Sequence, residues 1–219
     1  GNSVTIAQST NGQALDLTTQ GGVTRANHTF AGWSLVTTNG SGAVIPSPFT
    51  PTVPLFLYSS WVADTYVVSY NANGGNGAPT AASQNYTFGS ANIALTTKGT
   101  LNRTGYTFAG WSLETTNGSG PVVGATWTPT VPVKLYSSWT PNIYVVTYNA
   151  NGGNGAPTAT SQNYTFGASN LSLTTKGTLA RTGYTFAGWN TQADGNGTSY
   201  AAGTGTYNTA ADATLYAKW

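Results

Sequence analysis

The glycine-rich stretch YNANGGNGAPT could bind a ligand, and it occurs twice, at 70–80 and 148–158. Closely spaced glycines can cradle a phosphate, but a P-loop needs Lys and then Ser or Thr directly after its glycines, and a dinucleotide loop opens a helix. Here Gly77 is followed by Ala78 and Pro79. Because Asn and Gly tolerate the positive φ that a hairpin turn requires, the sequence predicts a turn between strands.

Groups that could catalyse a reaction are few. His28 is the single histidine, so any Ser–His chemistry would have to use it. Acid–base catalysis needs two carboxylates held close together and a calcium loop needs several within about a dozen residues, but the carboxylates are scattered: Asp16, Asp64, Glu114, Asp194 and Asp212. The absence of Cys removes disulfides and thiolate chemistry. The sequence therefore predicts no enzyme, no cofactor and no metal.

The composition narrows the class of protein. Charged residues make up 5% of the chain, against about a quarter in ordinary globular domains. The 7 basic residues are spread thinly, which argues against nucleic-acid binding. No apolar run approaches about 18 residues and no signal-peptide pattern is present, so no membrane insertion is predicted in this segment. The Thr-, Asn- and Gly-rich composition favours the outside of a bacterial cell, surface-attached or secreted.

Two sequence markers reveal internal repeats. The string TFAGW recurs at a spacing of 78 residues and ends at Trp33, Trp111 and Trp189. A Leu-Tyr pair followed by Trp recurs at spacings of 78 and 80 residues and gives Trp61, Trp139 and Trp219. The chain is thus predicted to contain three copies of one unit, with two residues inserted in the last.

These markers divide the chain into repeat 1 (1–62), repeat 2 (63–140) and repeat 3 (141–219). Repeat 1 lacks a counterpart of YVVSYNANGGNGA, so we expect it to be cut short or completed by VTIAQ (4–8) or another segment. Only VADT and TPNI join each closing Trp to the next predicted strand. Such short joins limit independent swinging, which predicts an extended, semi-rigid array.

Strand patterns dominate each copy. In YVVTY, alternation places Tyr144, Val146 and Tyr148 on one face and Val145 and Thr147 on the other. No stretch holds a convincing helical period. Each repeat is therefore predicted to be a small, mainly β domain.

The ordered motifs YxVTYNANGG, RTGYTFAGW and LYAKW resemble the Listeria-Bacteroides repeat of bacterial surface proteins, which is related to the B repeat of Listeria internalins. The resemblance covers 64–219 nearly end to end, and 12–61 for repeat 1. It implies a β-grasp-like, ubiquitin-like sandwich in each unit and a place in the stalk or adhesive region of a surface protein. One departure is His28, which stands where the other copies have Tyr106 and Tyr184. We expect it to be an aromatic stand-in, buried in the core.

Three arginines recur directly ahead of the aromatic strand: Arg25, Arg103 and Arg181. They could form a row of guanidiniums that grips an anionic glycan or a protein. Alternatively, each could stack on a Tyr or Trp of its own unit or bind turn carbonyls. The scarcity of other surface charge favours the structural role.

Three aromatics coincide after Gly/Thr/Pro-rich loops: Phe49, Trp127 and Tyr207. They could present platforms for sugar rings, but large aromatics in small domains are mostly buried, which favours a core role. Lys98 and Lys176 recur in TTKG. A Lys–Asn isopeptide crosslink would need a nearby carboxylate as proton relay, and no acid recurs there, so we expect both lysines to be solvated.

We therefore expect a non-catalytic extracellular repeat segment of a bacterial surface protein or adhesin. It would act as a stalk or spacer and as a weak multivalent module, since repetition can raise weak binding by about a hundredfold or more. The alternative is a carbohydrate-binding module that uses exposed aromatics. The expected partner is a protein or glycan on a host or neighbouring cell, and the chain itself is expected to be a monomer.

Overall fold

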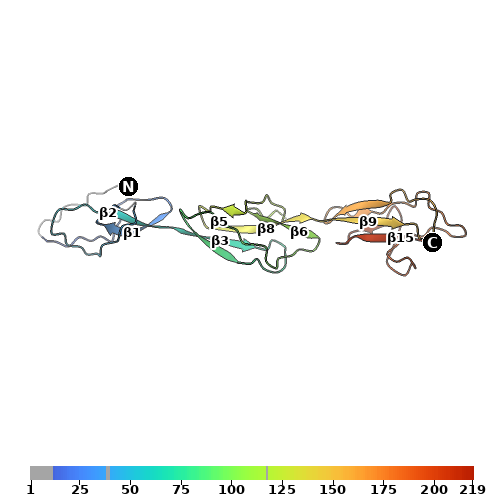
Figure 1. Ribbon diagram of the computed structural model, residues 1–219, viewed down its shortest axis with the longest axis horizontal. Coiled ribbons are helices and arrows are strands. Elements are labelled where there is room, and N and C mark those ends of the chain that lie inside the picture. Colours follow the sequence, from blue (N-terminus) through green and yellow to red (C-terminus); the bar gives the residue numbers. More distant parts are fainter. Residues whose placement is uncertain (1–11, 38–39, 117) are drawn as a thin grey trace. The chain divides into compact units, whose positions relative to one another are not determined.

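Figure 1 shows the computed structural model, which describes residues 12–37, 40–116 and 118–219. All regular elements in these ranges are β-strands, and none is a helix. The prediction of a mainly β chain is therefore confirmed. The segment 4–8, expected as one way to complete repeat 1, lies outside the described residues.

Contacts divide the chain into two compact units, and the division runs through repeat 2. The first unit contains residues up to Tyr70 together with 81–96 and 124–134, and the second contains 71–80, 97–123 and 135–219. Each unit is described by itself below.

The first unit is built from antiparallel strand pairs. They are β1 (His28–Ser34) with β2 (Tyr58–Ala63), β3 (Thr65–Asn71) with β4 (Ser83–Thr87), and β5 (Ile93–Ala94) with β7 (Thr126–Trp127). In the core of repeat 1, Trp33 of β1 is buried together with Leu17 and with Leu57, which directly precedes β2.

The second unit contains a hairpin from repeat 2 and the whole of repeat 3. In the hairpin, β6 (Tyr106–Ser112) pairs with β8 (Val133–Pro141). The sheet of repeat 3 has the order β10 (Ser161–Thr165), β9 (Ile143–Asn149), β15 (Ala213–Lys218), β12 (Gly188–Asn190) and β13 (Ser199–Tyr200). A small second sheet joins β11 (Leu171–Ser172) to β14 (Thr206–Tyr207). The first and last long strands of repeat 3, β9 and β15, lie side by side (Figure 1) and run parallel. The other pairs in these sheets are antiparallel.

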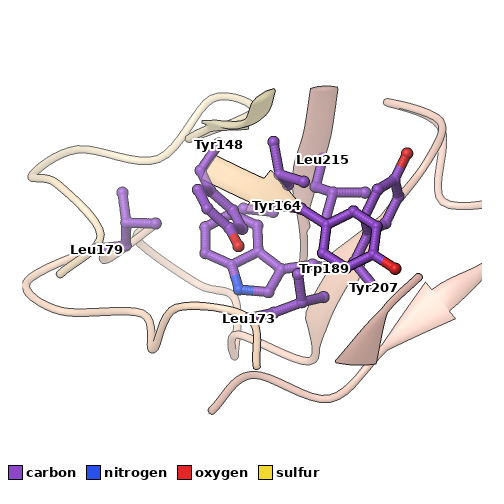
Figure 2. Packing of buried hydrophobic residues seen from close by; sticks show 9 residues of the cluster. Tyr148, Tyr164, Leu173, Leu179, Trp189, Tyr207 and Leu215 are labelled. Carbon is purple, nitrogen blue, oxygen red and sulfur yellow. The ribbon is translucent and has the colours of Figure 1, made fainter. Parts of the chain in front are cut away.

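The alternation predicted for β9 is confirmed, because Val146 and Tyr148 are buried while Val145 and Thr147 are exposed. Figure 2 shows the core that this face helps to build in repeat 3. Its labelled members are Tyr148, Tyr164, Leu173, Leu179, Trp189, Tyr207 and Leu215. Full burial of one such apolar side chain stabilises a fold by about 1.5–3 kcal/mol, so repeat 3 is held together mainly by this cluster.

In repeats 1 and 2 the TFAGW motif forms a bulged strand. Phe30 and Trp33 are three residues apart, which would place them on opposite faces of a regular strand. The β1–β2 register shifts between Phe30 and Gly32, and a bulge of this kind turns both side chains to the same side. The Phe30 ring consequently lies edge-on, 5.5 Å from the ring of Trp33 and 5.5 Å from that of Trp61.

The same aromatic triplet occurs in the other two repeats. Phe108 lies 5.3 Å from Trp111 and 5.6 Å from Trp139, and Phe186 lies 5.3 Å from Trp189 and 5.7 Å from Trp219. The TFAGW tryptophans are all buried, with exposed fractions of 1%, 3% and 0% along the chain. The sequence markers of the three repeats therefore pack in the same way.

Candidate functional site

The glycine-rich stretch is a tight turn, as predicted. In repeat 2 the two central residues, Asn73 and Gly74, have φ of 43° and 83°, and the Gly75 N–H donates to the Ala72 carbonyl at 2.9 Å. In repeat 3 the equivalent N–H, that of Gly153, donates at 3.0 Å. Positive φ at both central residues is the mark of a type I′ hairpin turn.

This turn binds the closing tryptophan of its own repeat. The Trp139 indole N–H donates to the Ala72 carbonyl at 3.3 Å, and the Asn73 amide donates to the Ser137 carbonyl at 3.0 Å. A Cβ built on Gly75 would lie 2.5 Å from the Trp139 ring, so only glycine permits this approach. Because the turn is packed against the indole ring, its glycines serve packing in this arrangement.

Two of the recurring arginines stack on aromatic rings of their own repeats. The guanidinium carbon of Arg103 lies 4.2 Å from the centre of the Tyr106 ring, and that of Arg181 lies 4.2 Å from the centre of the Tyr184 ring. These are cation–π distances, and they support the structural role that the sequence favoured. Arg25 lies against the turn at Gly40, since a Cβ there would be 2.5 Å from its Nη1, and Arg103 also lies against the equivalent turn at Gly118.

The three candidate sugar platforms differ in exposure. Tyr207 is buried in the core of repeat 3, with an exposed fraction of 4%, and Phe49 is half-buried and packs against the core of repeat 1. Both therefore serve packing. Trp127 is half-buried and pairs across strands with Ile93, which leaves part of its ring open to solvent.

His28 lies where repeat 1 meets repeat 2, and not in a core as expected. Its ring stands edge-on to Phe88 of repeat 2, with centroids 5.5 Å apart and planes at 76°. The Asp64 carboxylate accepts a hydrogen bond from the Thr29 hydroxyl at 2.8 Å, and the Asp64 N–H donates to the Asn27 carbonyl at 3.0 Å. We call this set of contacts joint 1, and it lies within the first unit.

An equivalent set of contacts, joint 2, links repeat 2 to repeat 3 within the second unit. The Tyr106 ring stands edge-on to Phe166, with centroids 5.6 Å apart. The Thr107 hydroxyl donates to the Asn142 side chain at 2.6 Å, and the Asn142 N–H donates to the Gly105 carbonyl at 2.9 Å. His28 thus takes the place of Tyr106. The prediction that His28 replaces an aromatic residue is confirmed, and the prediction that it lies in a core was wrong.

Joint 2 also depends on the absence of a side chain at Gly105. A Cβ built there would lie 2.1 Å from Cδ1 of Phe166, a distance that no real contact allows. The φ of Gly105 is 79°, and the equivalent residue in joint 1, Asn27, has φ of 59°. Asn27 accepts a hydrogen bond from the Tyr66 hydroxyl at 2.8 Å. In each joint, a residue with the left-handed backbone conformation therefore lies at the contact with the next repeat.

The carboxylates have separate local roles. The Thr18 hydroxyl donates to Asp16 at 2.6 Å and holds the pKa of that carboxyl below its ordinary value. Asp212 accepts a hydrogen bond from the Val145 N–H at 2.8 Å, and Asp194 accepts one from the Asn196 N–H at 3.0 Å. In the described ranges no three His, Asp or Glu side chains come together as a metal site.

The recurring lysines bind their own turns. Lys98 and Lys176 are exposed. Their ammonium groups donate to the carbonyls of Leu101 at 3.3 Å and Leu179 at 3.4 Å. To form an isopeptide bond, each lysine nitrogen would first have to give up its hydrogen bond to the turn carbonyl.

A buried asparagine in repeat 3 was missed by the sequence reasoning. Asn190 has an exposed fraction of 0%. Its amide donates to the carbonyls of Gly195 at 3.1 Å and Gly197 at 2.9 Å, and its Oδ1 accepts from the Gln192 N–H at 2.8 Å. The equivalent positions are Ser34 and Ser112. The change from Ser to Asn beside the two-residue insertion was the signal that could have revealed it.

Tyr148 carries a hydroxyl with a shifted pKa inside repeat 3. Its hydroxyl donates to the Gln162 side chain and accepts from the Thr174 N–H at 3.3 Å. Burial raises the pKa of Tyr148 above its ordinary value, and the bond from Thr174 opposes the shift. Tyr70 of repeat 2 likewise donates to Gln84, and burial raises its pKa as well. These hydroxyls tie neighbouring strands together, and each acts as both donor and acceptor.

Within the part of the chain that the structure describes, no helix is long and apolar enough to cross a membrane. No solved structure matches the chain.

Repeated β units with matching aromatic cores and matching joints define a tandem-repeat protein. The sequence matches the Listeria-Bacteroides repeat domain family over residues 66–138 and 144–218. The chain therefore belongs to this family, as the motifs indicated. The two matches fall inside the ranges predicted for repeats 2 and 3.

Two relatives come from Evansella cellulosilytica. One, named "Putative membrane protein", is 29% identical over 171 residues, which cover 75% of this chain and 24% of the relative. The other, named "Putative Gly-rich membrane protein", is 31% identical over 138 residues, which cover 58% of this chain and 15% of the relative. The chain thus matches less than a quarter of the length of either protein.

Proposed function

We propose that this chain is a non-catalytic extracellular segment of a bacterial surface protein, where it acts as a stalk or spacer. The observation that carries the proposal is that joints 1 and 2 are built alike, from an aromatic pair, an Asp or Asn side chain and a backbone hydrogen bond. A flexible linker would need none of these contacts. The family membership and the names of the two relatives support a place at the cell surface.

The proposal includes a β-grasp-like fold for each repeat and an elongated arrangement of the three. The parallel pairing of β9 with β15 in repeat 3 supports the first part. The chain passes from β8 to β9 through Asn142 alone, and from β2 to β3 through Asp64 alone, which supports the second part because such connections leave little freedom.

Small-angle X-ray scattering of the 219-residue chain tests the arrangement. A compact domain of this length has a radius of gyration of about 17 Å. A stalk should give a clearly larger value and a pair-distance distribution with a long tail. A value near that of a compact domain would contradict the proposal.

Weak multivalent adhesion is the second part of the proposed role. A surface with three copies of one unit can gain affinity by avidity. The partner would be a protein or glycan on a host or neighbouring cell. Binding of the whole chain to such cells should exceed that of a shorter variant that ends after the second repeat, and equal binding of the two would argue for a spacer alone.

Carbohydrate binding is retained as an alternative because Trp127 is half-buried beside a Gly/Thr/Pro-rich loop. A glycan array with the whole chain and the Trp127→Ala variant tests it. Binding that is lost in the variant would support the alternative. Tyr207→Phe is a suitable control, because the Tyr207 ring is buried and the substitution keeps its volume.

A further inference from the structure

Repeats 2 and 3 carry equivalent Gly-Tyr surfaces, of which one is covered by a neighbouring repeat and the other is exposed. Gly105 is buried and Tyr106 is half-buried, because Phe166 packs on them in joint 2. The equivalent residues of repeat 3, Gly183 and Tyr184, are exposed, and the exposed fraction of Tyr184 is 57%.

The two surfaces share a backbone conformation at the glycine and an arginine stacked on the tyrosine ring. The φ of Gly105 is 79° and that of Gly183 is 80°. Both tyrosines carry an arginine guanidinium at 4.2 Å from the ring centre. A Cβ on Gly183 would meet no atom within 4 Å, whereas one on Gly105 would meet the Phe166 ring. The surface of repeat 3 therefore already has the shape that receives a phenylalanine in joint 2.

Strand pairing differs between the two surfaces in a related way. In repeat 2, β6 begins at Tyr106, which pairs with Pro141, beyond the closing Trp139. In repeat 3, β12 begins only at Gly188, which pairs with Lys218. A strand that continued beyond the closing tryptophan, as β8 does, would lengthen β12 toward Tyr184 and pair its backbone groups.

We propose that Gly183, Tyr184 and Thr185 form a docking surface for a further repeat of the same family. A Phe of the docked repeat would pack on Gly183 and Tyr184, as Phe166 packs on Gly105 and Tyr106. An Asp or Asn side chain of the docked repeat would accept a hydrogen bond from the Thr185 hydroxyl, as Asn142 accepts one from Thr107. Another repeat is the favoured occupant because this surface matches an occupied one in residue type, φ and arginine stacking. The proposal extends the stalk function, since it names the partner by which a stalk of such repeats would grow.

An extended chain tests this surface. A second copy of residues 140–219 is attached directly after Trp219, so that an Asn follows that tryptophan at the spacing that separates Asn142 from Trp139. Amide hydrogen exchange is then measured for Thr185 and Phe186 in the 219-residue chain and in the extended chain, because the N–H groups of Tyr184 and Ala187 already donate to the carbonyls of Arg181 and Lys218 in the shorter chain. We expect exchange at these amides to slow by about tenfold or more in the extended chain. Unchanged exchange would overturn the proposal.

Two alanine substitutions give a matched control. Gly105→Ala and Gly183→Ala impose the same strain at positive φ, but only the first also pushes a Cβ into Phe166. In the 219-residue chain Gly105→Ala should therefore lower the thermal midpoint more than Gly183→Ala does, by about 2–4 °C or more. In the extended chain both substitutions should lower the thermal midpoint by the same amount, because both glycines would then be covered by a phenylalanine. If Gly183→Ala costs the same in both chains, the surface does not receive a repeat.

The outcomes separate this proposal from the stalk function. Scattering of the unextended chain reports on the stalk whether or not Tyr184 is covered in the extended chain. Unchanged exchange combined with an elongated unextended chain would refute the docking surface alone.

Discussion

The ring of Phe166 stands perpendicular to the ring of Tyr106, with the centroids 5.6 Å apart and the planes at 90°. The two residues belong to different repeats, and His28 and Phe88 repeat the relationship at 5.5 Å. An edge-to-face pair contributes about 0.5–1.5 kcal/mol beyond its buried area. Successive repeats thus stabilise one another through a defined contact.

The contribution of joint 2 can be measured with two tyrosines. Tyr106→Ala and Tyr184→Ala each remove an arginine stack at 4.2 Å, but only Tyr106 also packs against Phe166. We expect Tyr106→Ala to lower the free energy of unfolding by at least about 0.5–1.5 kcal/mol more than Tyr184→Ala does, because Tyr106 is also the more buried of the two. Urea denaturation checks this, and equal losses would show that the ring pair contributes nothing to stability.

The turn of repeat 3 should depend on the side chain of Asn151. Its amide donates to the carbonyls of Ala193 at 2.7 Å and Ala217 at 2.9 Å, and its φ is 48°. Asn151→Ala loses two hydrogen bonds and strains the backbone, so unfolding should become about 2–4 kcal/mol easier. Asn151→Gly keeps the turn relaxed and should cost about 1–2 kcal/mol less. A glycine variant no better than the alanine variant would contradict this account of the turn.

Burial makes Asn190 a second sensitive position. Asn190→Ala would leave the carbonyl of Gly195 and the N–H groups of Gln192 and Gly197 without their side-chain partner. A buried unsatisfied polar group costs about 1–3 kcal/mol, so we expect at least this loss in thermal or chemical unfolding of repeat 3. Ser112→Ala is the matched control in repeat 2, because Ser112 accepts from the Glu114 N–H at 3.0 Å. It should cost less than Asn190→Ala.

The Tyr148 hydroxyl predicts an alkaline limit to stability. Because burial raises its pKa in the folded state, folding favours the protonated form. This contribution is fully present below the ordinary pKa of 10.0 and is lost as pH rises through the folded-state value. Unfolding followed by circular dichroism between pH 8 and pH 12 should therefore show a loss of stability above about pH 10. Tyr148→Phe should make this decline shallower, and an identical pH profile would exclude Tyr148 as its source.

Sequence patterns were sufficient for much of the fold. The alternation in YVVTY predicted the buried face of β9 correctly, because strand faces follow a period of two residues. The paired Asn and Gly predicted the turn, since few other residues adopt positive φ. The equal spacing of the TFAGW tryptophans predicted equal surroundings, and these three indoles are indeed all buried against a phenylalanine.

Contacts between repeats could not be read in the same way. His28 was expected in a core because its equivalents are tyrosines, but its ring packs on Phe88 of the next repeat. The sequence shows that the position is aromatic, but it does not show which neighbouring residue packs on it. Asn190 was missed for a related reason, since most of its partners are backbone groups of the following loop, and in the sequence only the change from Ser to Asn beside the insertion marks the position.

The parallel pairing of β9 with β15 sets the way in which repeat 3 resists a pulling force. Tension along the chain would enter at Ile143, at the start of β9, and leave near Lys218, at the end of β15. The hydrogen bonds that join these strands lie across that direction, so they are sheared together and not opened one after another. Several of these hydrogen bonds would therefore have to break at once before the core of repeat 3 opened under tension.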